Sequence, residues 1–385
     1  GMKLPALSSI RKQNLRKVLD LLTLASGVTR LELAEAAGLS NMTVTNLVDI
    51  LKEHGVLRLQ TLQREGSARP AQGRKAESIS LSGEEKAWLL VDISNRQFTL
   101  TLLGFDVHPL LEMHDDHQGE YLDRLERFLL EAKACVSLAL EGRELLGVAI
   151  VTPGPYEISS DTVNNQRLPQ LNGVKVKELF RRCLGEYEYY VDEDVKFAVR
   201  AFSDLMVSPG CEVLFYLYIG EGVGGAAVHG GNMLRGLNAT AGDAGHLIAG
   251  SRSTFESHLS TEAFARLLGM PEEPSAQRLQ DALLRMAEEQ PQRYDEALDV
   301  MAKTTAEMLH GVLWMLDPTH VIIDCVYARP REDAFVQAVK GHLKQLFADE
   351  KRLLPQIAHS DLGVSSVLRG AVHVLQRAWL ERILM

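Results

Sequence analysis

A short run of polar side chains near the N-terminus is the first part of this sequence that could do chemistry. Met42, Thr43, Thr45 and Asn46 lie close together, and three of them carry hydroxyl or amide groups. Such groups at the front of a helix can hydrogen-bond to base edges in the major groove of DNA. The same residues would also suit the solvated face of an ordinary helical hairpin.

These side chains require a helix, and their neighbours predict one within a helix–turn–helix. Thr29 and Glu32 have the spacing of a capping box, Gly38 can end a first helix in a left-handed turn, and Ser40 can cap a second. Helical periodicity gives each of two helices an apolar face. These faces consist of Val44, Leu47, Val48 and Leu51 in the second helix and Leu15, Val18, Leu19 and Leu22 in a helix upstream.

The residues that follow predict a wing. Residues 56–64 and 78–81 have strand character, and the segment between them is rich in Gly, Pro and basic residues. We expect its cations to contact phosphates or a minor groove, and a solvated linker is the alternative. The complete set of predicted DNA contacts is Arg30, Ser40, Asn41, Met42, Thr43, Thr45, Asn46, Arg64, Arg69, Arg74 and Lys75.

Charge divides the chain into a basic head and an acidic body. Residues 1–75 carry 12 Lys and Arg against 6 Asp and Glu, a net charge of +6, whereas the remaining residues carry 29 against 45, a net charge of −16. A head that meets phosphates should be basic, and an acidic body should discourage non-specific wrapping on DNA. We therefore predict two parts, a winged helix-turn-helix over residues 1–82 and a body over residues 83–385.

The remaining composition is that of a cytoplasmic globular protein. Hydrophobic residues make up 46% of the chain, but no apolar run reaches the roughly 20 residues that span a bilayer. The start of the sequence lacks the apolar segment of a secretory signal. The four cysteines, Cys135, Cys183, Cys211 and Cys325, are scattered and favour reduced thiols over disulfides or metal ligands.

From residue 87 the pattern alternates between strands and helices. Strands are predicted over residues 87–94, 98–106, 145–155, 187–195, 212–231 (two strands around a Gly-rich turn) and 320–326, and helices over 121–141, 261–316, 333–348 and 367–383. Paired strands with crossover helices, occurring twice, predict an α/β body of two lobes with a cleft.

The head and five segments, one at the end of the wing and four in the body, resemble the ROK family of repressors and sugar kinases. The five segments are GRKAESISL (73–81), GVAIVTPGP (147–155), VDEDVKFAV (191–199), IGEGVGGAAV (219–228) and AGDAGHL (241–247). The resemblance covers essentially the whole chain and implies an actin-like, ribonuclease H-like ATPase fold with a sugar site between two lobes. The winged head resembles the repressor branch of that family.

Departures from the family argue against a kinase and against zinc. The first phosphate turn of family kinases has two glycines, where this chain has Ser94 and Asn95, and the glycines near the adenosine are replaced by Asp324, Cys325 and Val326. Glu221 lies in the surviving Gly-rich loop, where a carboxylate would repel phosphate. The cysteines that would complete a zinc site with His246 are missing. We therefore expect no catalytic residues, no metal and no cofactor.

The resemblance implies that part of the sugar site is kept. Asp194 matches the family's catalytic Asp, Asp243 the signature Glu, His246 the signature His, and Glu256 the Glu that follows the last zinc cysteine in the family. Carboxylates and an imidazole can accept hydrogen bonds from vicinal hydroxyls. The alternatives are a helix cap for Asp194, a core histidine for His246 and a surface position for Glu256. Glu193 and Lys196 replace asparagines of the family, and they could pair with each other or select a charged ligand.

These features predict a DNA-binding transcriptional regulator of carbohydrate genes, most often a repressor. It would bind an inverted-repeat operator as a homodimer or tetramer and respond to a sugar effector, without any membrane association. The first alternative is a regulator whose body only dimerises or binds a protein partner. The second, less favoured, is a sugar kinase with a DNA-binding head.

Overall fold

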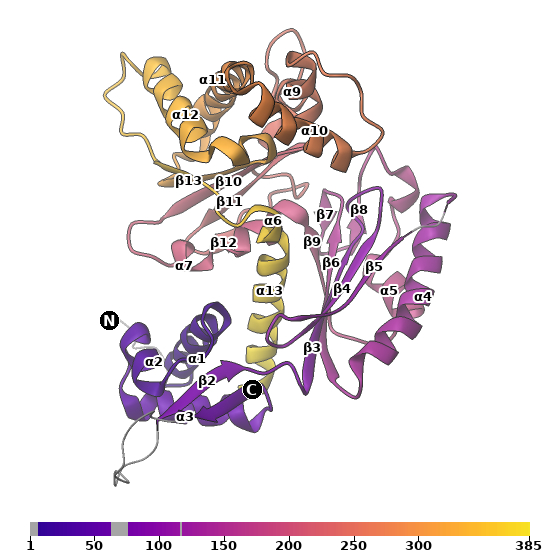
Figure 1. The fold of residues 1–385 in the computed structure, drawn as a ribbon, viewed down its shortest axis with the longest axis vertical. Coiled ribbons are helices and arrows are strands. Elements are labelled where there is room, and N and C mark those ends of the chain that lie inside the picture. The colour runs from indigo at the N-terminus through magenta and orange to yellow at the C-terminus, as the bar shows by residue number, and fades with distance from the viewer. Residues whose placement is uncertain (1–6, 63–75, 116–117) are drawn as a thin grey trace. The chain divides into compact units, whose positions relative to one another are not determined.

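The computed structural model describes residues 7–62, 76–115 and 118–385 (Figure 1). These residues form two compact units. Unit 1 comprises Gly1–Glu193 and Ala371–Met385, and unit 2 comprises Asp194–Gly370. No helix among the described residues is long and apolar enough to cross a membrane.

The head, at the start of unit 1, is a winged helix-turn-helix. It consists of α1 (Leu7–Leu24), α2 (Arg30–Ala37), α3 (Asn41–Glu53), β1 (Leu57–Thr61) and β2 (Glu77–Leu81). The predicted capping box of Thr29 and Glu32 is present, and Gly38 adopts the left-handed conformation with φ of 66°. The predicted apolar faces of α1 and α3 are buried. Their burial fixes which face of α3 is left outward.

The wing strands pair antiparallel and are joined to the helices by a bridge between Val28 and Ile79. Arg64, Arg69, Arg74 and Lys75 lie outside the described residues, so their predicted contacts stay predictions. The domain boundary predicted after residue 82 falls between β2 and the first strand of the next sheet.

The rest of unit 1 is built on a five-stranded sheet with the order β5-β4-β3-β6-β9. Its strands are β3 (Lys86–Asp92), β4 (Thr99–Gly104), β5 (Pro109–His114), β6 (Glu144–Thr152) and β9 (Tyr189–Glu193). Helices α4 (Tyr121–Leu140) and α5 (Val176–Cys183) pack on one face of this sheet (Figure 1). Short connections follow β6, namely β7 (Tyr156–Glu157), β8 (Thr162–Val163) and η1 (Pro169–Leu171).

Unit 2 contains a second five-stranded sheet with the order β12-β11-β10-β13-β14. Its strands are β10 (Val213–Ile219), β11 (Val223–His229), β12 (Asn232–Met233), β13 (His320–Cys325) and β14 (Gln356–His359). As in unit 1, an antiparallel hairpin is continued by parallel strands. This repetition confirms the predicted α/β class.

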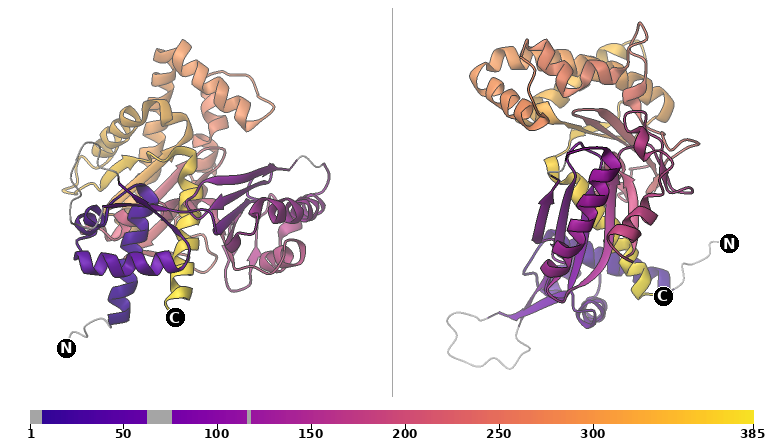
Figure 2. Two further views of the ribbon diagram at one scale, coloured as in Figure 1. Left: turned by 60° about the horizontal axis from the view of Figure 1, so that its bottom comes forward. Right: turned by 90° about the vertical axis from the view of Figure 1, so that its right-hand side faces the viewer.

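Helices cover both faces of the second sheet. One face carries α8 (Phe255–Leu259), α9 (Thr261–Leu267), α10 (Ala276–Glu289), α11 (Pro291–Leu316) and α12 (Glu332–Leu346), the last three lying together in Figure 2. The other face carries α6 (Asp194–Arg200) and α7 (Ser203–Met206). The remaining elements are η2 (Ala244–His246), η3 (Val326–Arg331), η4 (Gly363–Ser365) and α13 (Ser366–Ile383).

Candidate DNA interface and effector site

The outward face of α3 holds the predicted base-reading residues. Asn41, Met42 and Asn46 are exposed, and the Met42 side chain retains 76% of its accessible surface. Thr43 and Thr45 lie at the edge of this face and are half-buried. An exposed polar strip on the second helix of a winged head is the surface that meets base edges in this class of fold.

Two of the predicted DNA contacts also have structural roles. The Ser40 hydroxyl accepts a hydrogen bond of 3.1 Å from the Thr43 backbone N–H and lies 2.8 Å from the Thr43 hydroxyl, so it caps α3. Arg30 forms an ion pair of 2.7 Å with Glu77 on β2. This pair holds α2 against the wing, and contact of Arg30 with DNA stays a prediction.

Three of the four predicted effector residues lie together in unit 2. The Asp243 carboxylate lies 3.3 Å from Nε2 of His246. Burial raises the pKa of Asp243 and so does the negative charge of Glu256, while His246 and Lys196 act in the opposite direction. One Glu256 oxygen accepts a hydrogen bond of 3.0 Å from the Val223 N–H, which places it at the start of β11. These three side chains form what we call the acid–imidazole cluster.

Glycines allow the loop that carries Asp243 and His246 to pack directly on β11. A Cβ at Gly245 would lie 2.0 Å from the Val223 carbonyl oxygen, and one at Gly225 would lie 2.3 Å from the Gly242 carbonyl oxygen. No side chain fits at either distance without moving backbone. The two glycines therefore set the distance between the cluster and the Gly-rich turn.

This close approach yields a stability prediction. Gly245→Ala should lower the free energy of unfolding by about 1–2 kcal/mol, because the added methyl group displaces backbone. Gly341→Ala is the matched control, since Gly341 lies within helix α12 with open space around its Cβ position. That control should instead stabilise by about 0.5–1 kcal/mol. Urea unfolding of both variants checks the pair, and equal effects of the same sign would contradict it.

Asp194 is the first residue of α6, and one of its carboxylate oxygens accepts a hydrogen bond of 2.7 Å from the Val195 N–H. Asp194 is thus a helical residue of the first turn of α6, where a carboxylate favours the N-terminal end of the helix dipole, and its part in effector binding stays a prediction. The negative charge of Asp194 also affects the pKa of two tyrosines of β10. Burial, followed by the charge of Asp194, raises the pKa of Tyr218, and Asp194 makes a smaller contribution at Tyr216.

Lys196 is buried, with 2% of its surface exposed. Its Nζ donates a hydrogen bond of 2.6 Å to the carbonyl of Ala239, a residue with a positive φ of 56°. Lys196 therefore ties α6 to the loop that leads into Asp243. The sequence pattern indicated an ion pair or a charged ligand for this lysine and contained no signal for this backbone contact.

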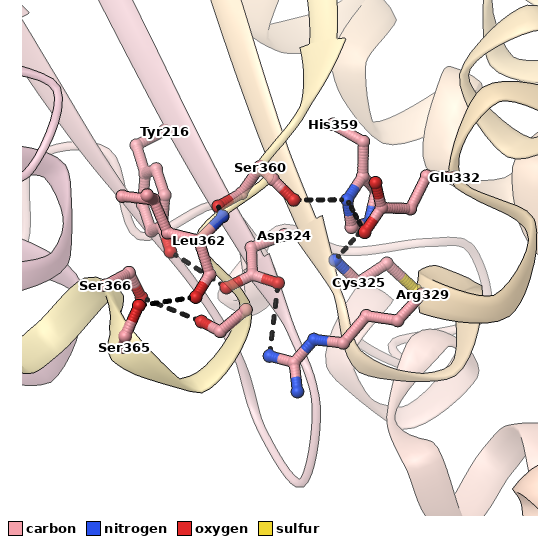
Figure 3. A network of polar contacts seen from close by, with 11 residues as sticks. Tyr216, Asp324, Cys325, Arg329, Glu332, His359, Ser360, Leu362, Ser365 and Ser366 are labelled. Carbon is pink, nitrogen blue, oxygen red and sulfur yellow. Dashed lines mark hydrogen bonds and ion pairs between the residues drawn. The ribbon is translucent and has the colours of Figure 1, made fainter.

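The two positions where the family's kinases have nucleotide-binding glycines are occupied by polar networks of the chain itself. Asp92 accepts hydrogen bonds from the N–H and the hydroxyl of Ser94, at 2.8 and 2.5 Å. Asp324, with 1% exposure, lies 3.3 Å from both the Tyr216 hydroxyl and the Arg329 guanidinium (Figure 3). In both turns, the polar side chains make hydrogen bonds within the chain itself.

No group of three or more His, Cys, Asp or Glu side chains suited to a metal ion occurs among residues 7–62, 76–115 and 118–385. The four cysteines are free, with Cys183 and Cys325 buried. The expectation of no zinc remains a prediction from the missing cysteines.

Comparison with known proteins assigns the chain to a family. The model of the ROK family matches residues 119–378, and a model described as winged helix-turn-helix DNA-binding matches residues 11–58. The chain belongs to the ROK family. This ROK protein therefore combines the family's body with a head of DNA-binding type, as its motifs predicted.

Among curated relatives, this ROK protein is 22% identical over 240 residues to the DNA-binding transcriptional dual regulator NagC of Escherichia coli strain K12. The match covers 62% of the chain and 58% of NagC, and so less than two thirds of that relative. It is 28% identical over 242 residues to the kanosamine kinase of Amycolatopsis mediterranei strain S699, covering 60% of the chain and 77% of the kinase.

Among solved structures, the chain is similar to a ROK family transcriptional regulator described as a homologue of the E. coli MLC protein. The TM-score is 0.64 at 18% identity, with 98% of each chain covered. A ROK glucokinase from Streptomyces griseus gives a TM-score of 0.60 at 17% identity, covering 75% of this chain and 98% of the kinase. These similarities confirm the predicted fold, a winged helix-turn-helix followed by an actin-like body.

Proposed function

We propose that this ROK protein is a transcriptional regulator, most often acting as a repressor, that binds an inverted-repeat operator as a dimer. The observation that carries the proposal is the exposed polar strip of α3 on a winged helix-turn-helix head. Its basic charge, +6 over residues 1–75, supports phosphate contact. The regulator among its relatives, NagC, supports the same assignment.

We further propose that the effector is a sugar or sugar derivative held by Asp194 and the acid–imidazole cluster. The cluster brings together two carboxylates and an imidazole from η2, its N-cap residue and α8, and the Asp243 side chain keeps 30% of its surface exposed. Charged acceptors that remain partly accessible can hydrogen-bond to hydroxyl donors. The names of the relatives suggest which sugars to test first, namely N-acetylglucosamine, kanosamine and glucose.

A two-step experiment tests both parts. Duplexes selected from a random pool should converge on an inverted repeat, and fluorescence anisotropy should then give a Kd for the selected duplex. N-acetylglucosamine, kanosamine, glucose and their phosphates are next added to the complex. Release of the duplex by one of them supports the sugar-controlled regulator. Sequence-specific binding that no compound changes favours the alternative in which the body dimerises or meets a protein partner.

The kinase alternative makes a separate prediction. We expect no sugar-dependent ATP turnover, because Ser94 and Asp324 place polar side chains where nucleotide-binding glycines stand in the family. A coupled ADP assay with each of the three sugars checks this, with a ROK glucokinase as the positive control. Turnover above the sugar-free background would establish the kinase activity that the kinase relatives suggest.

A further inference from the structure

Helix α13 is shared between the two units. The chain passes between them at Glu193–Asp194 and again at Gly370–Ala371. The second passage lies inside α13, which is one continuous helix from Ser366 to Ile383. Its first residues therefore belong to unit 2, and the rest of the helix belongs to the unit that contains the head.

The start of α13 lies beside a buried tyrosine of the sheet of unit 2. The Tyr216 hydroxyl, on β10, donates a hydrogen bond of 3.3 Å to Asp324 at the end of β13. Burial raises the pKa of this phenol, and a side-chain hydrogen bond with Ser366 opposes that effect. Ser366 is the first residue of α13. Figure 3 shows Tyr216, Asp324 and Ser366 gathered at this point.

The segment between β14 and α13 adds further hydrogen bonds. The Ser360 N–H donates to the Ile323 carbonyl at 2.7 Å, and the Ser360 hydroxyl accepts from the Leu362 N–H at 3.3 Å. The Ser365 hydroxyl then donates to the Leu362 carbonyl at 2.6 Å. This chain of contacts holds the entry to α13 against β13 as well.

One turn further along, α13 packs closely on α6. A Cβ at Gly370 would lie 1.6 Å from the Phe197 carbonyl oxygen, so only a glycine allows this approach. Helix α6 begins with Asp194 and carries Lys196, which is bonded to the loop before Asp243. The first turns of α13 therefore rest on the helix that bears one proposed effector residue and positions another.

The second half of α13 contacts the head. Arg377 pairs with Asp20 of α1 at 2.7 Å, and Gln376 donates to the Thr23 hydroxyl at 3.2 Å. Lys12 and Arg16 of α1 both pair with Glu381, the former at 2.6 Å. The Trp379 ring meets His54, the residue that caps the end of α3, with centroids 5.6 Å apart.

We propose that α13 passes the effector state of unit 2 to the head, and that Tyr216 and Asp324 are its anchor in unit 2. A helix transmits displacement along its axis because its hydrogen bonds are internal, and a rigid packed element that contacts both sites can carry energetic coupling between them. The identity of the effector rests on the proposed function, but the mechanical link does not. The link can be tested without sugar or DNA.

Hydrogen–deuterium exchange of the full chain, with neither sugar nor DNA present, provides the test. In Tyr216→Phe and Asp324→Asn, amides of α1 should exchange about fivefold faster than in the unsubstituted protein, because a loosened α13 holds the head less firmly. Asp295→Asn is the matched control. Asp295 also pairs with an arginine of η3, Arg331 at 3.0 Å, but it lies outside the α13 anchor. In Asp295→Asn, the amides of α1 should exchange at the same rate as in the unsubstituted protein.

Asp324→Asn removes a buried charge and can impair the folding of unit 2. If that variant does not fold, Tyr216→Phe and Ser366→Ala decide the test. Unchanged exchange in α1 for these two folded variants would overturn the proposal. The link is also reciprocal. Arg377→Gln, at the head end of α13, should therefore speed amide exchange at residues 362–370 in unit 2. The proposal is also overturned if these amides exchange at the same rate as in the unsubstituted protein. A sugar that fails to bind affects none of these outcomes.

Discussion

Replacing Asn46 with alanine is expected to weaken binding to the selected operator about 5- to 150-fold and to relax preference at one base pair, a loss of roughly 1–3 kcal/mol. Asn46 is exposed at the centre of the outward face of α3, one turn after Met42. An amide can bond to adenine through two hydrogen bonds, so its loss removes both affinity and discrimination. Anisotropy with the selected duplex and its single-base variants measures both quantities.

Gln345→Ala serves as the control for Asn46→Ala. It removes an exposed amide from helix α12 of unit 2, far from the head in sequence. Its Kd and base preference should equal those of the unsubstituted protein. The orientation inferred for α3 is wrong if Asn46→Ala leaves both quantities unchanged as well.

The head could be predicted from sequence because its signals are local. A capping box needs only Thr29 and Glu32, three positions apart, and the left-handed turn needs only Gly38. The apolar faces of α1 and α3 repeat with the helical period, so the outward face of α3 followed directly. These features depend on neighbours along the chain, which a single sequence contains.

Three short elements were not predicted, namely strand β5, helix α5 and strand β14. Strand β5 has only exposed and half-buried residues at a sheet edge, and β14 has only four residues. The partners that stabilise these two strands lie elsewhere in the chain, so periodicity could not identify them. Helix α5 has eight residues and no side-chain cap, but its buried residues Val176, Leu179, Phe180 and Cys183 have helical spacing, so the sequence did contain its signal.

The arrangement of side chains around the candidate site could be predicted only in part, for a related reason. Family resemblance supplied Asp243, His246 and Glu256, and the structure brings them together around the start of β11. Residue types did not reveal that Tyr216 and Asp324, 108 positions apart, would meet. In the sequence Asp324 only signalled a lost glycine. Its bond to Tyr216 depends on the parallel pairing of β10 with β13, which no local pattern specifies.

Asp243→Asn is expected to separate ligand binding from stability. Loss of a charged acceptor should weaken binding of the effector sugar about 10- to 100-fold, because a hydrogen bond to a charged group contributes roughly 1.5–3 kcal/mol. Burial is the largest influence on Asp243 and raises its pKa, so the carboxylate form is disfavoured in the folded protein. The asparagine variant should therefore unfold at a higher Tm than the unsubstituted protein at pH 7.

The sign of the pH dependence follows from the same shift. Because the folded-state pKa of Asp243 lies above its unfolded value of 3.8, the folded protein holds the proton more tightly. The cost of the buried carboxylate is thus fully present above the folded-state pKa and disappears as the pH falls toward the unfolded value. The Tm advantage of Asp243→Asn should shrink over that interval, and sugar binding by the unsubstituted protein should weaken over it.

Thermal unfolding between pH 4 and pH 8, with calorimetric titration of the sugar that releases the operator, checks both effects of Asp243→Asn. Asp349→Asn, at an exposed position after α12, is the control and should change neither Tm nor affinity. A variant that is destabilised at pH 7 would mean that the attraction of His246 and Lys196 outweighs the cost of burial. Unchanged sugar affinity together with the higher Tm would place the ligand elsewhere, and Asp243 would then be a buried charge without a role in recognition.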